Sequence, residues 1–260
     1  MNNGNSLRNV FLAAVLGGVL GGGIVGGIMM QRDPADRKAQ TVETDVALSP
    51  AKKQAALNLE LFRAVYDKQL AEEDAIARAK DLLDRGADIN AGIHGTALHD
   101  VVGRPDHPLK LAKFLIDNGA SLDIATSDYG ETPLMNLISS ITFNGNEPMT
   151  AQDTAMLNLL LASGAARNTQ DTRGQTALHY AAINTMVGEG GSLPVPGKFI
   201  ALAEILKSAG VNPLIRDNDG KTALDIIKGE AADQKDAIDY LQKWEQQLTK
   251  KPAGPGLGRG

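Results

Sequence analysis

The chain has 260 residues, 43% hydrophobic and 22% charged, an ordinary balance for a folded protein of one or two domains. Its formal net charge is −5 and its lysines and arginines are scattered, so we expect no nucleic-acid partner. The chain contains no cysteine, which excludes disulfides, thiolate metal sites and cysteine nucleophiles.

The first predicted element is an uncharged apolar run. Residues 1–8 form a short tail that ends in Arg8, and residues 9–30 carry no charge. A helix of this length spans about 33 Å, which matches the roughly 30 Å hydrocarbon core of a bilayer. We therefore predict that residues 9–30 form one uncleaved transmembrane signal anchor. A cleaved signal peptide is the alternative, although the run is long for one and no Ala-x-Ala precedes Gln31.

Glycines recur every four residues within this run. One such row consists of Gly18, Gly22 and Gly26. Small residues at this spacing allow two membrane helices to pack closely, so we predict a homo-oligomer through this row. The alternative, given equal weight, is a glycine-rich anchor that has no helical partner.

The orientation of the anchor follows from the charges around it. Counting Arg32, Arg37 and Lys38 after the run favours a cytoplasmic domain. The short basic start before the run instead resembles a bacterial signal anchor, and the lack of cysteine suits an exported domain. We predict a membrane-anchored, single-pass protein of bacterial origin with a periplasmic domain, and the cytoplasmic side is the alternative for the domain.

The next segment, residues 31–54, contains prolines and scattered charges and is predicted to be a flexible linker. A pair of helices is predicted after it. The apolar residues that indicate the first helix are Leu59, Phe62, Ala64, Val65 and Tyr66, and those that indicate the second are Ile76, Ala79, Leu82 and Leu83. This pair lacks the phrase found in later units, so we expect it to cap a stack of repeats.

A short phrase then occurs four times. Its copies are Gly95-Thr-Ala-Leu-His, Gly130-Glu-Thr-Pro-Leu-Met, Gly174-Gln-Thr-Ala-Leu-His and Gly220-Lys-Thr-Ala-Leu-Asp. Apolar runs end in glycine before the first copy, at Gly86, and between the copies, at Gly119, Gly164 and Gly210. Threonine caps the start of a helix, and glycine adopts the left-handed conformation that ends one. The pattern resembles ankyrin repeats, whose unit of about 33 residues contains Thr-Pro-Leu-His.

This resemblance implies an all-α fold, a solenoid of about five helix pairs with short hairpin turns, which we expect one transmembrane helix to precede. The ankyrin-repeat domain with its capping repeats is predicted at residues 55–250, and a disordered tail at 251–260. The residues of the structural phrase are Thr96, His99, Thr132, Thr176, His179 and Thr222. In ankyrin repeats the phrase histidine braces the neighbouring backbone. We expect the loop histidines His94 and His107 to be solvated.

The repeat unit is longer than the family standard, because the phrase threonines lie 36, 44 and 46 residues apart. The extra residues fall between the two helices of a unit, at 103–108, 141–153 and 183–198. Drift explains such loops, since closure entropy grows slowly with length, but long loops also often bind partners. We predict partner contacts on these loops and on the hairpin tips, at Tyr129, Phe143, Met149, Met186 and Val195.

The sequence shows no catalytic constellation, so we predict no enzyme activity, no cofactor and no metal. We predict a membrane-tethered ankyrin-repeat protein, held by residues 9–30, that binds an unidentified protein. Two alternatives remain. One is a toxin inhibitor or immunity protein, and the other is a membrane organiser that assembles through its glycine-rich helix.

Overall fold

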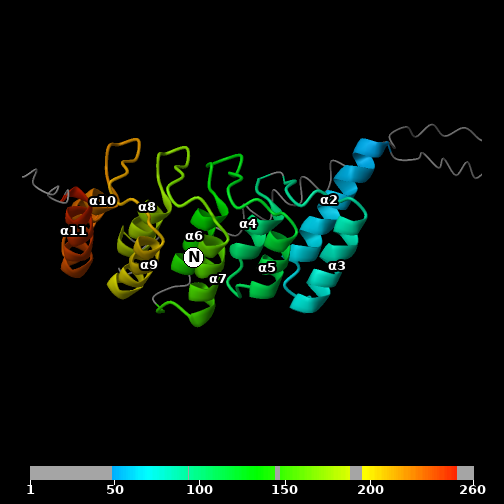
Figure 1. The fold of residues 1–260 in the computed structure, drawn as a ribbon, viewed down its shortest axis with the longest axis horizontal. Coiled ribbons are helices and arrows are strands. Elements are labelled where there is room, and N and C mark those ends of the chain that lie inside the picture. The colour runs from blue at the N-terminus through cyan, green and yellow to red at the C-terminus, as the bar shows by residue number, and fades with distance from the viewer. Residues whose placement is uncertain (1–48, 93, 144–146, 188–194, 251–260) are drawn as a thin grey trace, which may run out of the picture. The chain divides into compact units, whose positions relative to one another are not determined.

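The computed structural model describes residues 49–92, 94–143, 147–187 and 195–250. These residues form helices and turns, and they contain no strand. The helices of the described residues form five pairs in chain order, which can be followed in Figure 1. The pairs are α2 (Pro50–Tyr66) with α3 (Glu72–Asp84), α4 (Ala97–Val102) with α5 (Leu109–Asp117), α6 (Pro133–Phe143) with α7 (Ala151–Ala162), α8 (Ala177–Ala182) with α9 (Pro196–Ser208), and α10 (Ala223–Glu230) with α11 (Lys235–Thr249).

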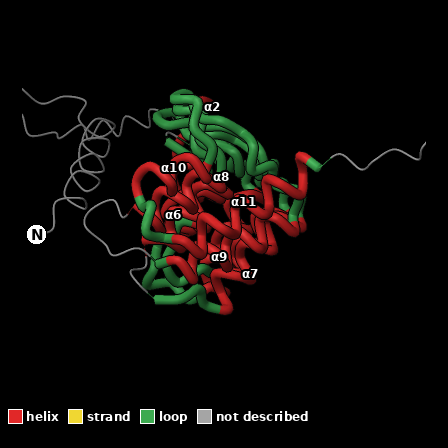
Figure 2. Tube along the Cα trace, turned by 90° about the vertical axis from the view of Figure 1, so that its left-hand side faces the viewer, coloured by secondary structure: helices red, strands yellow, loops and turns green. Residues whose placement is uncertain are grey.

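The helices form two layers. First helices contact first helices, as in α2 with α4 and α6 with α8, and second helices contact second helices, as in α3 with α5 and α9 with α11. Figure 2 shows α6, α8 and α10 on one side of α7 and α9. A π-helix, η1 (Ile183–Val187), continues α8 toward α9. Each layer thus buries a face that a single pair would leave exposed.

The phrase threonines begin the first helices. Thr96, Thr176 and Thr222 are the N-cap residues of α4, α8 and α10, each within a capping box. Such a cap satisfies backbone N–H groups that the first turn leaves without partners. The phrase leucines lie behind the caps in one continuous core and are at most 4% exposed: Leu98, Leu134, Leu178 and Leu224.

The phrase histidine links two successive repeats. The Thr96 N–H donates to Nδ1 of His99 at 3.0 Å, and His99 Nε2 lies 3.1 Å from the Glu131 carbonyl oxygen of the next repeat. Since Nδ1 accepts, Nε2 carries the proton and donates. His179 repeats both contacts, with Thr176 and with the Lys221 carbonyl.

A ladder of Asn and Asp side chains also connects the repeats. Each ladder residue lies either on α2 or four positions after a helix-ending glycine. Its side-chain oxygen accepts a hydrogen bond from the backbone N–H at the base of the next hairpin. The contacts are Asn58 with Asp88 at 2.8 Å, Asn90 with Ser121 at 2.7 Å, Asp123 with Ala166 at 2.7 Å, and Asn168 with Asn212 at 2.9 Å. In the last repeat the same position is Leu214, which is apolar and 38% exposed. The ladder therefore stops there.

The predicted transmembrane helix has to be removed from the fold class. No helix in the described part of the chain is long and apolar enough to cross a membrane. The longest of them, α2, has 17 residues and carries lysine, arginine and glutamate, whereas a membrane span needs about 20 mostly apolar residues. Residues 9–30, including Gly18, Gly22 and Gly26, lie outside the described residues, as does the predicted tail at 251–260.

Several predicted boundaries differ from those of the structure. Helix α2 begins at Pro50, inside the predicted linker 31–54, because Ser49 caps it and proline suits its first turn. The loop predicted at 141–153 is shorter, since α6 extends to Phe143 and α7 begins at Ala151. The loop predicted at 183–198 is shorter for the same reason, because η1 covers its start and α9 begins at Pro196.

Candidate protein-binding surface

The hairpins between repeats form a continuous row at one end of the helices (Figure 1). We call the hairpin tips around His94, Tyr129, Arg173 and Asn218 the finger row. Backbone hydrogen bonds join neighbouring tips: the Ser127 N–H donates to the His94 carbonyl at 3.2 Å, the Thr172 N–H to the Tyr129 carbonyl at 3.0 Å, and the Asn218 N–H to the Arg173 carbonyl at 2.9 Å. Each tip is therefore held in place by the next one.

Glycine makes the close packing between two fingers possible. Gly174 has a φ of +77°, a conformation that L side chains rarely adopt. A Cβ atom at this position would lie 2.6 Å from Oδ1 and 2.7 Å from the backbone nitrogen of Asn218. The third and fourth fingers can therefore pack this closely only because Gly174 has no side chain.

A buried phenol anchors the finger row to the helices. Tyr180 of α8 is 5% exposed, and its hydroxyl lies 2.8 Å from Glu131 Oε1 and 2.9 Å from Asp171 Oδ2. Arg173 Nη2 donates to the same hydroxyl at 2.9 Å, and the guanidinium carbon lies 5.5 Å from the centre of the Tyr180 ring. Burial, followed by the two carboxylates, raises the pKa of Tyr180 far above its ordinary value. The phenol therefore stays neutral and remains a hydrogen-bond donor.

The finger row combines a fixed backbone with exposed side chains. Tyr129 is 56% exposed although its carbonyl accepts from both Thr172 N–H and Thr172 Oγ1. Half of the Arg173 side chain is exposed, while its Nε donates to the buried Asp171 carboxylate at 3.2 Å. Tyrosine and arginine are enriched at protein interfaces and among the residues that contribute most to binding. The row thus presents such side chains with little ordering left to occur on binding.

The other predicted contact residues do not lie in the finger row. Phe143, 67% exposed, ends α6, and Met149 packs partly against the core. Val195 is half-buried at the start of α9 and its N–H donates to the Thr185 carbonyl at 2.8 Å. Met186 belongs to η1, but its side chain lies outside what the structure describes. Figure 1 shows the start of α7 at the end of the helices opposite the fingers.

The prediction of a solvated His107 was wrong. This histidine is 2% exposed, and its Nε2 lies 2.9 Å from Oδ1 of Asp153 in the first turn of α7. Burial lowers the pKa of His107 below its ordinary value, against the smaller opposite effect of Asp153. Asp153 also accepts the Thr150 N–H at 2.7 Å, so one buried carboxylate caps α7 and contacts the α4–α5 connection. These contacts give the pair a role in joining repeats.

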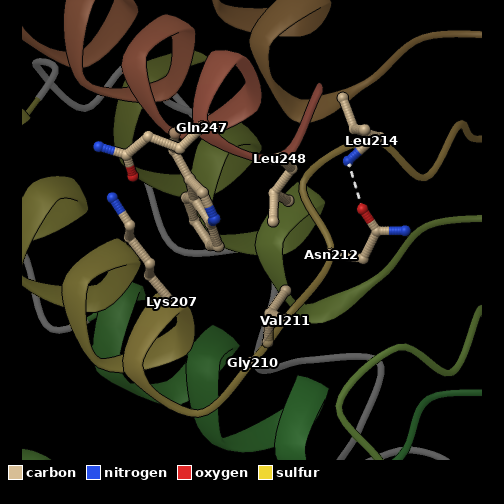
Figure 3. A pocket seen from close by; sticks show the side chains of 8 residues that line it. Lys207, Gly210, Val211, Asn212, Leu214, Gln247 and Leu248 are labelled. Carbon is tan, nitrogen blue, oxygen red and sulfur yellow. Dashed lines mark hydrogen bonds between the residues drawn. The ribbon is translucent and has the colours of Figure 1, made fainter. Parts of the chain in front are cut away.

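A groove lies at the C-terminal end of the stack, where the Asn and Asp ladder stops (Figure 3). It has a volume of about 480 Å³, and its lining residues are Lys207, Gly210, Val211, Asn212, Leu214, Trp244, Gln247 and Leu248. Trp244 is buried, whereas Leu248 is 54% exposed. The Lys207 ammonium lies 5.8 Å from the centre of the Trp244 ring. The lining residues come from α9, from the segment that follows α9 and from α11, so none of them belongs to the finger row.

Sequence reasoning did not identify Tyr180 and Arg173 as part of one cluster. The available signal was weak, because Tyr180 directly follows the phrase histidine and Arg173 stands in the hairpin before the phrase. Their partner Glu131 lies 49 residues from Tyr180 in the chain. Only the stacking of two repeats brings these residues together.

One comparison with known proteins agrees with a repeat architecture. No protein-family profile matches the chain. A stretch of 171 residues is 27% identical to Rabankyrin-5 of Homo sapiens, and it covers 63% of this chain but 13% of that protein. This partial similarity suggests ankyrin-type repeats. Nothing in the comparison supports the predicted membrane anchor or a bacterial origin.

Proposed function

We propose that this chain is a protein-binding scaffold, without catalysis of its own, whose finger row contacts the partner. The observation that carries the proposal is the exposed Tyr129 side chain on a tip whose backbone is fixed by Thr172. Proteins that bind through preformed surfaces lose less conformational entropy on association. The partial similarity to Rabankyrin-5, whose name includes ankyrin, also supports a scaffold role.

Arg173 adds the second contact of the proposed surface. Its Nε and Nη2 donate to Asp171 and Tyr180, which orients the guanidinium while half of the side chain remains exposed. An arginine held in this way is suited to a carboxylate or a backbone carbonyl of a partner. The finger row therefore offers one aromatic and one cationic contact on neighbouring tips.

Photo-crosslinking in the full-length chain tests the proposal. A benzoylphenylalanine at position 129 should capture the partner, and the same group at position 143 serves as the matched control because Phe143 is also an exposed aromatic residue. The proposal predicts a crosslinked product from position 129, whose yield falls when unlabelled protein competes for the partner. It predicts no product from position 143. Capture of the same partner at position 143 but not at 129 would contradict the assignment to the finger row.

A further inference from the structure

Helix α2 has a second apolar face in addition to the one in the core. Its core face consists of Leu61, Ala64 and Val65, which are at most 5% exposed. The second face, which we call the α2 seam, consists of Ala55, Leu59, Phe62 and Tyr66. These residues follow one another at spacings of four, three and four, the heptad pattern of a coiled-coil seam.

The α2 seam is exposed in the described structure. Leu59 is 37% and Tyr66 47% exposed, Ala55 is exposed, and Phe62 is half-buried. The rings of Phe62 and Tyr66 stack with their centres 5.7 Å apart and their planes at 9°. Apolar residues confined to such a narrow stripe fit the side chains of one further helix better than a broad sheet or loop surface.

We propose that the α2 seam pairs with the α2 seam of a second copy of this chain, in antiparallel orientation. In that arrangement Leu59 lies opposite the partner's Phe62, and Ala55 lies opposite the partner's Tyr66. The two-fold axis of the dimer generates a second copy of each of these two layers, so the seam has four layers. Every layer then combines a smaller with a larger side chain, so the seam is complementary to itself.

Charge favours the antiparallel over the parallel arrangement. Lys52 continues the seam toward the start of α2, and Asp67 caps the end of the helix. Antiparallel pairing brings Lys52 near the partner's Asp67, and it also sets the two helix dipoles in opposite directions. Parallel pairing would place Lys52 beside the same residue of the partner and Ala55 opposite a second alanine. A parallel seam would therefore be less stable, because two lysines would repel each other and two alanines would leave a gap between the helices.

The helix is already formed before it pairs. Ser49 caps α2, proline stands in its first turn, and its core face packs against α3 and α4. Association then requires little ordering of the backbone. Four layers are nevertheless few, and interfaces below about 1,000 Å² are generally weak or transient. The expected complex is a weak dimer, for which trapping by a disulfide is a better assay than size alone.

The absence of cysteine from the chain makes the test direct. Full-length Leu59→Cys and Phe62→Cys chains with tags of different size are mixed and oxidised gently. A disulfide requires Cα atoms within about 7 Å of each other. In the antiparallel pair, position 59 lies opposite position 62 of the partner, whereas two identical positions are offset by three residues, or about 4.5 Å, along the helices. The proposal predicts that the mixed disulfide forms faster than either self-disulfide. Faster self-coupling of the Leu59→Cys chain would show parallel pairing and overturn the proposal.

Two controls complete the experiment. Lys80→Cys on α3, where the side chain is 66% exposed, measures coupling by random collision. Adding Ala55→Glu to both seam variants should reduce the mixed product to that collision level while the circular dichroism spectrum stays unchanged, because Ala55 is exposed. Mixed coupling no faster than the collision control overturns the proposal. Protection of Cys at position 59 from maleimide without intermolecular coupling also overturns it, and would assign the seam to another segment of the same chain.

Discussion

Substitution of Gly174 by alanine tests how far the packing of adjacent fingers stabilises the fold. The left-handed conformation at φ +77° costs an alanine about 1–2 kcal/mol. The added Cβ would lie 2.7 Å from the Asn218 backbone nitrogen, so the neighbouring finger has to move. This movement weakens the 2.9 Å hydrogen bond from Asn218 N–H to the Arg173 carbonyl. Overpacking and the lost bond add about 2 kcal/mol, for a total loss of about 3–4 kcal/mol.

Gly220 provides a matched control for this substitution. It has a φ of +76°, but a Cβ atom built on it meets nothing within 4 Å. Gly220→Ala should therefore cost only the conformational strain of about 1–2 kcal/mol. Urea unfolding followed by circular dichroism and by the single tryptophan, Trp244, measures both values. Equal losses for the two variants would show that contact between the fingers contributes nothing.

Three further predictions concern the links between repeats. Asn168→Ala removes the acceptor of the Asn212 N–H and should lower the free energy of unfolding by about 1–3 kcal/mol in urea titrations. Tyr180→Phe removes the single hydroxyl donor that the Glu131 and Asp171 carboxylates share. It should also lower the free energy of unfolding by about 1–3 kcal/mol, with increased hydrogen exchange in the finger row. Burial lowers the pKa values of His99, His107 and His179 below their usual 6.5, so these side chains take up protons more readily in the unfolded chain. Stability should therefore be fully present above about pH 6.5 and be lost as the pH falls below it, by up to about 1.4 kcal/mol per pH unit for each histidine. An unfolding free energy that is constant between pH 7 and pH 5 would contradict this reasoning.

The helix pairs could be predicted because their signals are local. Threonine at a helix start and glycine after a helix end each satisfy backbone needs within a few residues. The ends of α6 and η1 could not be predicted, because their extent depends on packing against other repeats. Ile141, for example, was placed in a loop but is fully buried as part of α6.

The features that the sequence pattern does not reveal depend on how distant parts of the chain are arranged in the fold. The sequence pattern places both His107 and its partner Asp153 in loops, so it does not indicate that the two form a buried pair. Leu59 and Tyr66 read as part of the core-forming helix pattern, yet they belong to the exposed α2 seam. A helical period shows that a face is apolar, but it does not show whether that face has a neighbour.

The affinity of the captured partner for finger-row variants tests the central claim most directly. Truncating a residue that contributes strongly to an interface typically costs about 2 kcal/mol or more, close to a thirtyfold loss of affinity. Calorimetry should show such a loss for Tyr129→Ala and a comparable one for Arg173→Ala, with Phe143→Ala unchanged. Unchanged affinity in both finger-row variants, or a loss confined to Phe143→Ala, would contradict the assignment of the finger row as the protein-binding surface.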